Sequence, residues 1–139
     1  SIVAAPEYLA KYGRPNAPAD LNQHALLTYP PGNPINDWHF VVDGTETVIR
    51  AQGTIMTSNG DSILKAVQAG GGLAMLPSFM TGEHIKNGRL IEVLGEYVRE
   101  DVPIFAVYPS SRHLSPKVRA FVDFLVDTYG AHPYWLADV

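Results

Sequence analysis

Serine, histidine and aspartate all occur in this chain, but their spacing forms no catalytic group. A serine hydrolase of the strand-turn-helix type carries its nucleophile in the pattern G-x-S-x-G, and this sequence contains none. The five histidines lie far apart, and none forms the H-x-x-x-H pair that places two zinc ligands on one helix face. The sequence therefore predicts neither a hydrolase nor a metal site, and we expect no enzymatic activity.

The glycine run at Gly70–Gly72 does not have the arrangement of a nucleotide-binding loop. A dinucleotide fingerprint needs a third glycine where this chain has Met75, and its glycines open a helix, whereas this run follows one. The neighbouring carboxylates Glu100 and Asp101 lie in a polar connector, which solvation explains better than acid–base catalysis. The absence of cysteine excludes a thiolate metal site, a disulfide framework and a cysteine nucleophile. No cofactor is predicted.

The stretch S-N-G-D, residues 58–61, has residue types that begin a helix and that also bind polar ligands. Ser58 can accept a hydrogen bond from the backbone N–H three residues later, and Asp61 can reach back, so we expect a helix that begins between residues 59 and 61. The first N–H groups of a helix have no partner within it and attract anions or polar groups. Capping and ligand binding both remain open as roles for Ser58 and Asn59.

The elements around this stretch alternate between strand and helix, which predicts an α/β fold with a mixed sheet flanked by helices. Asp43-Gly44 favours the tight turn of a β-hairpin. The pattern predicts strands over 2–5, 53–57, 73–76, 89–94 and 103–108, hairpin strands over 38–42 and 45–49, and helices beginning at 6, 59–61, 77 and 115. The strand-to-helix junctions at 5–6, 58–59 and 76–79 are expected to converge on one edge of the sheet, where open α/β folds bind ligands.

Size and charge narrow the class of protein. The 139 residues, 46% of them apolar, suffice for one domain of ordinary size, and no apolar run is long enough to span a membrane. The net charge is −4, and the ten Lys and Arg residues are scattered, which argues against nucleic-acid binding by this surface. The first residues show no signal-peptide pattern, and together with the absence of cysteine this predicts a cytoplasmic location.

Short motifs in a particular order give this chain a resemblance to the effector-binding domain of LysR-type transcriptional regulators. Their order and spacing extend over residues 2–126, nearly the whole chain. The motifs are V-A-A-P-E-Y-L-A-K-Y-G-R-P at 3–15, P-A-D-L-N-Q-H at 18–24, W-H-F at 38–40, S-N-G-D at 58–61, A-G-G-G-L-A-M-L-P at 69–77, G-R-L at 88–90 and L-S-P-K-V-R-A-F-V-D-F-L at 114–125.

The resemblance implies a two-lobed domain like the periplasmic binding proteins, which holds a small molecule between its lobes. Residues 1–108 would form the second lobe, and residues 109–139 a C-terminal helix and tail that return to a first lobe largely missing here. The strands at 2–5 and 103–108 would connect the lobes. The winged helix-turn-helix that binds DNA is absent, so DNA contact is expected only through that other domain. The alternative is a solute-binding protein or an enzyme lobe of the same fold, and the sequence upstream of Ser1 would distinguish them.

The resemblance also implies which residues face the ligand. The effector would be a small molecule, often a carboxylate, and Thr57, Ser58 and Asn59 would offer it hydroxyl, amide and backbone donors. The apolar residues expected to line the same edge are Pro6, Pro77 and Phe79. The negative charge of Asp61 would weaken an anion site if that side chain faced the cleft.

The last predicted helix carries an apolar face that needs a partner. Its apolar positions follow helical spacing at Val118, Phe121, Val122, Leu125 and Tyr129. Either the helix folds back onto its own lobe, helped by the tail Tyr134-Trp135, or it docks on another copy of the chain. We favour the second arrangement and expect a dimer.

Overall fold

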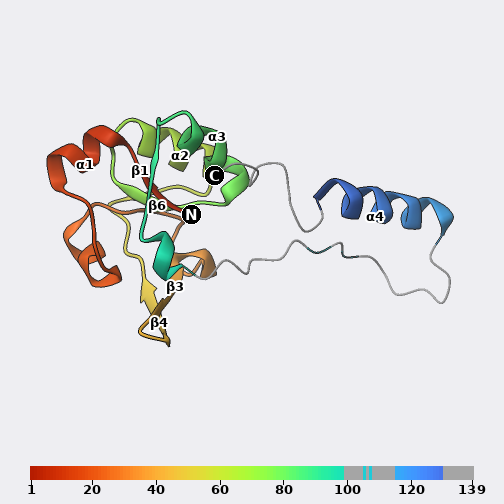
Figure 1. Ribbon diagram of the computed structural model, residues 1–139, viewed down its shortest axis with the longest axis horizontal. Helices are drawn as coiled ribbons and strands as arrows, with labels where there is room; N and C mark the ends of the chain where they lie inside the picture. Colours follow the sequence, from red (N-terminus) through yellow and green to blue (C-terminus); the bar gives the residue numbers. More distant parts are fainter. Residues whose placement is uncertain (99–104, 106, 108–114, 130–139) are drawn as a thin grey trace. The chain divides into compact units, whose positions relative to one another are not determined.

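The computed structural model describes residues 1–98, 105, 107 and 115–129. The chain divides into two units, residues 1–99 and residues 100–138, and each is described by itself. Figure 1 shows the path of the chain through the first unit, from β1 to β7, and helix α4 of the second.

The centre of the first unit is a three-stranded sheet in the order β6-β1-β7. Strand β1 (Ile2–Ala4) lies between β6 (Leu73–Met75) and β7 (Ile91–Val93) and runs antiparallel to both. All three residues of β1 are buried, as expected for a short central strand without a polar face. The predicted strands at 2–5, 73–76 and 89–94 are therefore confirmed at their cores.

A second, parallel pair of strands extends this sheet. Strand β2 (Leu27–Thr28) pairs in parallel with β5 (Ile55–Met56). A single parallel bridge between Leu26 and Leu73 connects the pair to the central sheet. Because β1 is antiparallel to β6 while β2 and β5 are parallel to it, the pairing is mixed, as the sequence predicts.

The helices begin and end at residues that the sequence marks. Helix α1 (Pro6–Tyr12) has proline in its first turn and ends before Gly13, whose φ of 83° only glycine adopts readily. Helix α2 (Gly60–Gln68) begins within the predicted range. The remaining helices of this unit are α3 (Ser78–Lys86), followed by Gly88, and the 3-10 helices η1 (Pro18–Gln23), η2 (Pro34–Asn36) and η3 (Gly95–Tyr97).

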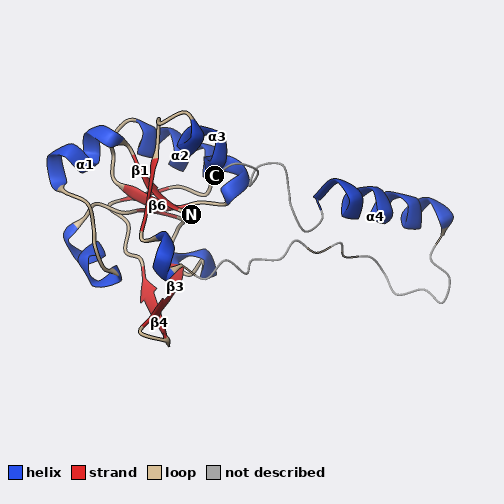
Figure 2. Cartoon of the chain, viewed as in Figure 1, coloured by secondary structure: helices blue, strands red, loops and turns tan. Residues whose placement is uncertain are grey.

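The predicted hairpin is present and projects from the rest of the unit (Figure 2). Strand β3 (Asp37–Val42) pairs with β4 (Thr45–Arg50) across Asp43-Gly44. Both turn residues have positive φ, 50° and 76°, which is the requirement of the type I′ turn that matches the twist of a hairpin. On β3, Trp38 and Phe40 are buried, so the hairpin is fixed to the core through one face.

Two hydrophobic clusters form the core, one on each face of the sheet. Alternation along β1 divides them, since Ile2 and Ala4 belong to one cluster and Val3 to the other. The first cluster includes Tyr8 of α1 and the two hairpin aromatics. The second includes Ile63 and Val67 of α2. Helix α2 thus buries Ile63 and Val67 against the sheet.

The second unit contains helix α4 (Pro116–Tyr129). Its predicted start is confirmed, because the Ser115 hydroxyl oxygen accepts a hydrogen bond from the Val118 N–H at 3.4 Å. Of the predicted strand 103–108, the structure describes only Phe105 and Val107, which are exposed and not in a strand. The tail residues Tyr134 and Trp135 lie outside the described residues.

Candidate functional site

Three strands of the first unit end at the same edge of the sheet. Because β2 is parallel to β5 and bridges in parallel to β6, their carboxyl ends point the same way. The residues that follow these strands are Tyr29, residues 57–60 and residues 76–80, and we call this set the carboxyl edge. Carboxyl edges of open α/β sheets are where such folds bind ligands.

The turn into α2 is built by hydrogen bonds between neighbouring polar residues. The Thr57 N–H donates to the Thr28 carbonyl at 3.1 Å, which ties the turn to β2. The Thr57 hydroxyl oxygen accepts from the Asn59 N–H at 3.3 Å, and the Asn59 side-chain oxygen accepts from the Ser62 N–H at 3.0 Å. Asn59 is therefore the N-cap of α2, and the expectation that Ser58 caps the helix is wrong. The Ser58 side chain is left exposed at the edge.

The N-terminus of α2 keeps two unused donors. Neither the Gly60 nor the Asp61 N–H has a hydrogen-bond partner in the part of the chain that the structure describes. These donors lie at the positive end of a nine-residue helix, where they favour an acceptor or an anion. The Asp61 carboxylate is exposed beside them, so the local charge is not uniformly positive.

Tyr29 belongs to this edge, and the sequence analysis missed it. A Cβ at Gly60 would lie 3.0 Å from the Tyr29 hydroxyl and 3.3 Å from the Met80 methyl carbon, so both side chains lie against the start of α2. The Tyr29 hydroxyl has no hydrogen-bond partner among the described residues. Its position directly after β2, matching that of Thr57 after β5, is the signal that could have identified it.

Pro77 and Phe79 lie at the same edge as Ser58 and Asn59. Pro77 is the N-cap residue of α3, and the contact of Met80 with Gly60 brings the first turns of α3 and α2 together. The Phe79 side chain is 59% exposed. Five of the six predicted site residues, Thr57, Ser58, Asn59, Pro77 and Phe79, therefore share one edge.

Pro6 lies at the opposite edge. Strand β1 is antiparallel to β6, with Ile2 opposite Met75 and Ala4 opposite Leu73. The junction after Ala4 therefore lies where β6 begins, not where it ends. The expectation that all three strand-to-helix junctions converge is wrong for Pro6, because the sequence does not report the direction in which β1 crosses the sheet.

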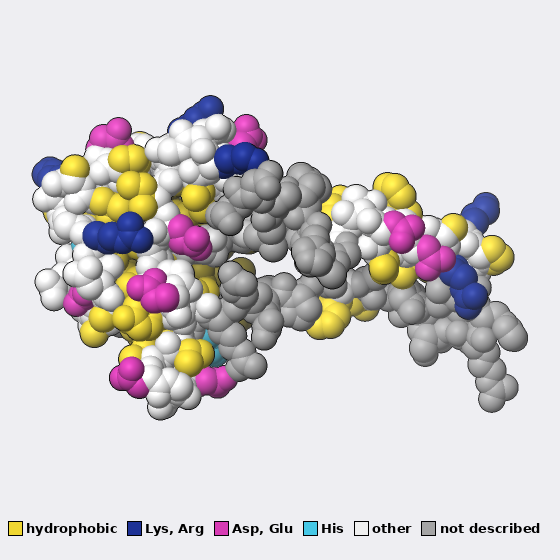
Figure 3. Space-filling model, viewed as in Figure 1, with side chains coloured by type: hydrophobic (Ala, Val, Ile, Leu, Met, Phe, Trp, Pro, Cys, Tyr) yellow, Lys and Arg dark blue, Asp and Glu magenta, His cyan; other side chains and the backbone are white. Residues whose placement is uncertain are grey.

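Neither a metal cluster nor a membrane-spanning helix is found in the described residues. No group of three or more His, Cys, Asp or Glu side chains could hold a metal ion there, and no helix there is long and apolar enough to cross a membrane. On the face seen in Figure 3, Lys and Arg side chains are spread among acidic ones and do not gather into a patch. The arrangement at the carboxyl edge can bind a polar ligand, and it contains no nucleophile–base pair that would catalyse a reaction.

Comparison with known proteins gives the family. The model of the LysR substrate binding domain matches residues 1–130. The chain belongs to this family. Among its relatives, the HTH-type transcriptional regulator YhjC of Escherichia coli is 34% identical over 88% of this chain and 42% of its own length. The regulator CrgA of Neisseria meningitidis is 32% identical over 93% of this chain and 43% of its own.

Solved structures of LysR-type regulators have the same fold as this LysR substrate-binding domain. The regulatory domain of CrgA superimposes with a TM-score of 0.79 at 31% identity, over 93% of this chain and 64% of that one. The full-length virulence activator AphB of Vibrio cholerae superimposes with a TM-score of 0.71 at 26% identity, over 91% of this chain and 43% of that one. The predicted α/β fold of the periplasmic-binding-protein type is confirmed. The chain spans about two fifths of the length of the relatives, which are named as regulators of transcription and not as enzymes.

Proposed function

We propose that this chain is the effector-sensing part of a LysR-type transcriptional regulator that acts in the cytoplasm. A small molecule would bind at the carboxyl edge, between this lobe and a first lobe. The lobes would close around it and so favour one arrangement of a regulator that binds DNA through a separate winged helix-turn-helix. No step of this function requires a cofactor or a chemical reaction.

The observation that carries the proposal is the group of unused donors at the start of α2. The Gly60 and Asp61 N–H groups and the Tyr29 hydroxyl have no partner among the described residues and lie against the same helix end. Buried polar groups of a protein are nearly always hydrogen-bonded, so a cleft closed over these donors would need an acceptor from a ligand. A carboxylate or a carbonyl oxygen of the effector would supply it.

The apolar part of the edge suits the rest of the ligand. Phe79 and Pro77 are exposed beside the donors, and Met80 lies against Gly60. Ligand sites of this size are mostly apolar with a few placed polar groups, and this edge would provide half of such a site. Pro6 would not contribute, since β1 carries it to the other edge.

Substitution of the turn tests this proposal in the full-length regulator. We expect Ser58→Ala combined with Asn59→Ala to remove the effector-dependent change in operator binding, while operator affinity without effector stays close to that of the wild type. Asn16→Ala, an exposed asparagine outside the carboxyl edge, is the matched control and should respond normally. A double variant that responds at wild-type effector concentrations would contradict the assignment.

A second substitution tests the charge of the effector. Asn59→Asp keeps an oxygen that can cap α2 but adds a negative charge at the edge. A carboxylate effector should then bind more weakly, whereas a neutral carbonyl effector should bind nearly as before. Comparing Asn59→Asp with Asn59→Ala therefore separates the effect of losing the cap from the repulsion between the introduced carboxylate and a carboxylate effector.

We also propose that the regulator is a homo-oligomer in which α4 contributes to a contact. Among the five predicted positions, the side chains of Val118, Phe121 and Tyr129 are 38%, 60% and 43% exposed in the described part of the chain. Val122 and Leu125 are half-buried. An apolar helix face of this extent favours a protein partner, either a first lobe or a second copy.

A further inference from the structure

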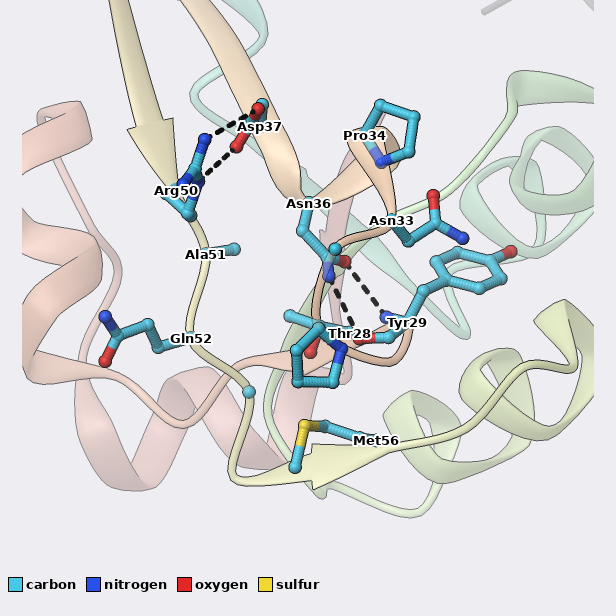
Figure 4. Close-up of a pocket in the computed structure, with 13 residues that line it drawn as sticks. Thr28, Tyr29, Asn33, Pro34, Asn36, Asp37, Arg50, Ala51, Gln52 and Met56 are labelled. Carbon is cyan, nitrogen blue, oxygen red and sulfur yellow. Dashed lines mark hydrogen bonds and ion pairs between the residues drawn. The ribbon is translucent and has the colours of Figure 1, made fainter.

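A pocket of about 540 Å³ lies beside the carboxyl edge, entirely within the first unit (Figure 4). One wall is the loop that follows β2, and the other is the segment from Arg50 to Met56 that leads from β4 into β5. None of the six predicted effector-binding residues lines it. Its volume falls within the range of small-molecule sites, which is roughly 300–1,000 Å³.

The pocket is held open by hydrogen bonds that use up the polar atoms of Asn36. This buried side chain accepts from the Tyr29 N–H at 3.0 Å and donates to the carbonyl oxygens of Tyr29 and Pro30 at 3.0 and 3.2 Å. The Asn36 carbonyl accepts from the Ala51 N–H at 2.8 Å, which joins the two walls. The loop therefore has its shape before any ligand arrives, and Asn36 has no donor left to offer one.

Thr28 gives the pocket an unused polar group. The residue is only 3% exposed and lines the pocket, yet its hydroxyl makes no hydrogen bond within the described residues. The hydroxyl lies so close to Gly53 that any Cβ at that position would overlap it. The hydroxyl is not among the fully buried polar side-chain atoms that lack a partner, so it is open to the pocket, and a ligand there would replace water as its hydrogen-bond partner.

The charged groups of the pocket neutralise each other. Arg50 donates from Nε and Nη2 to the two carboxylate oxygens of Asp37 at 2.8 and 3.3 Å, as drawn in Figure 4. The other lining residues are uncharged, and the apolar ones among them are Pro31, Pro34, Ala51 and Met56. An anion entering here would meet the Asp37 carboxylate and a guanidinium that is already paired, and this pair is largely exposed to solvent, so it offers an anion little net attraction.

We propose that this pocket binds a second ligand, an uncharged and mostly apolar molecule with one hydroxyl or carbonyl group that bonds to Thr28. The site needs no first lobe, because all of its walls come from residues 28–56. It adjoins the effector site proposed at the carboxyl edge and shares Tyr29 with it, but its ligand differs in charge from a carboxylate effector.

Titration of 2-naphthol into the isotope-labelled 139-residue chain tests the proposal by nuclear magnetic resonance. We expect saturable binding with the largest shifts at Thr28, Gly53 and Met56, and much weaker binding of 2-naphthoate, which has the same rings but a negative charge. Absence of saturable binding, equal binding of the anion, or shifts centred on residues 57–60 and 76–80 would each overturn it.

Four variants locate the site. Thr28→Val keeps the shape of the side chain and removes the hydroxyl, so 2-naphthol affinity should fall roughly threefold to tenfold. Met56→Asp should abolish binding, whereas Ile55→Asp, at a similarly exposed neighbour in β5 that does not line the pocket, should leave it unchanged. Ser58→Ala with Asn59→Ala should also have no effect on 2-naphthol, which separates this site from the effector site. Unchanged affinity in both Thr28→Val and Met56→Asp would contradict the assignment.

Discussion

The Tyr29 hydroxyl lies against Gly60, 3.0 Å from the place that a Cβ at this residue would occupy. Glycine at the first position of α2 therefore lets the end of β2 and the start of α2 meet at the carboxyl edge. A separation of 3.0 Å is shorter than ordinary carbon–oxygen van der Waals contact, so any larger residue must displace the hydroxyl.

We expect Gly60→Ala to weaken the effector response of the full-length regulator with little change in stability. The flexible ends of Tyr29 and Met80 can move away, and alanine is favoured over glycine in helices by up to about 1 kcal/mol. Combining Gly60→Ala with Tyr29→Phe should relieve the contact without restoring the hydroxyl, and so should not restore the response. A single variant with a normal response would show that the position of Tyr29 is unimportant for sensing.

Asn59 and Ser58 should differ in their contributions to stability. Asn59→Ala removes the oxygen that accepts from the Ser62 N–H and should lower the free energy of unfolding by about 1 kcal/mol. Ser58→Ala removes no cap and should be within about 0.5 kcal/mol of the wild type. Urea denaturation of the 139-residue chain measures both, and Asn59→Ser is the control that keeps a capping oxygen. Equal losses at the two positions would be inconsistent with Asn59 as the cap.

Asp20 should make stability depend on pH below about 4. Its carboxylate accepts from the Asn16 and Ala17 N–H groups at 2.9 and 3.0 Å, and these bonds hold its pKa below the ordinary 3.8. Because the pKa is lower in the folded than in the unfolded state, the stabilisation is complete well above pH 3.8 and is lost as the pH falls through the folded value.

Denaturation of the wild type and Asp20→Asn across pH 2.5–7, roughly the range over which carboxylates titrate, checks this. The stability difference between them should shrink as the solution becomes more acidic. Asparagine at this position keeps an acceptor without titrating, so a difference that stays constant with pH would exclude Asp20 as the source.

The apolar face of α4 should control association. Phe121→Asp together with Leu125→Asp should shift the chain from dimer to monomer or aggregate in sedimentation, because burial of each large apolar side chain is worth about 1.5–3 kcal/mol. Asp123→Asn with Asp127→Asn changes exposed polar positions of the same helix and is the matched control. A wild-type chain that sediments as a compact monomer, with α4 protected from hydrogen exchange, would mean that the apolar face of α4 is buried within its own chain.

Local residue chemistry was sufficient to predict most elements of the first unit. Asp43-Gly44 specifies a turn with two positive φ angles, and Gly13 and Gly88, both with positive φ, follow the ends of α1 and α3. The alternation of strand and helix indicated an α/β fold, because each element has its own spacing of apolar residues and its own terminating residues. The motifs of the LysR family led to the same fold independently of these local patterns.

The direction in which each strand crosses the sheet was not predictable from local residue chemistry. Pro6 and Pro77 both follow a buried strand, yet β1 and β6 are antiparallel, so the two prolines lie at opposite edges. Tyr29 was missed because it precedes a proline- and glycine-rich loop whose course back to Asn36 depends on buried hydrogen bonds. Asn59 replaces Ser58 as the cap because Thr57 binds the Asn59 N–H and shifts the start of the helix by one residue.

Calorimetry of the natural effector with the full-length regulator and with the 139-residue chain tests the central claim most directly. If the effector is held between this lobe and a first lobe, the chain alone leaves it partly in water and should bind it far more weakly than the full-length protein, or not measurably. Equal dissociation constants for the two proteins would contradict a site between lobes and would place effector recognition elsewhere.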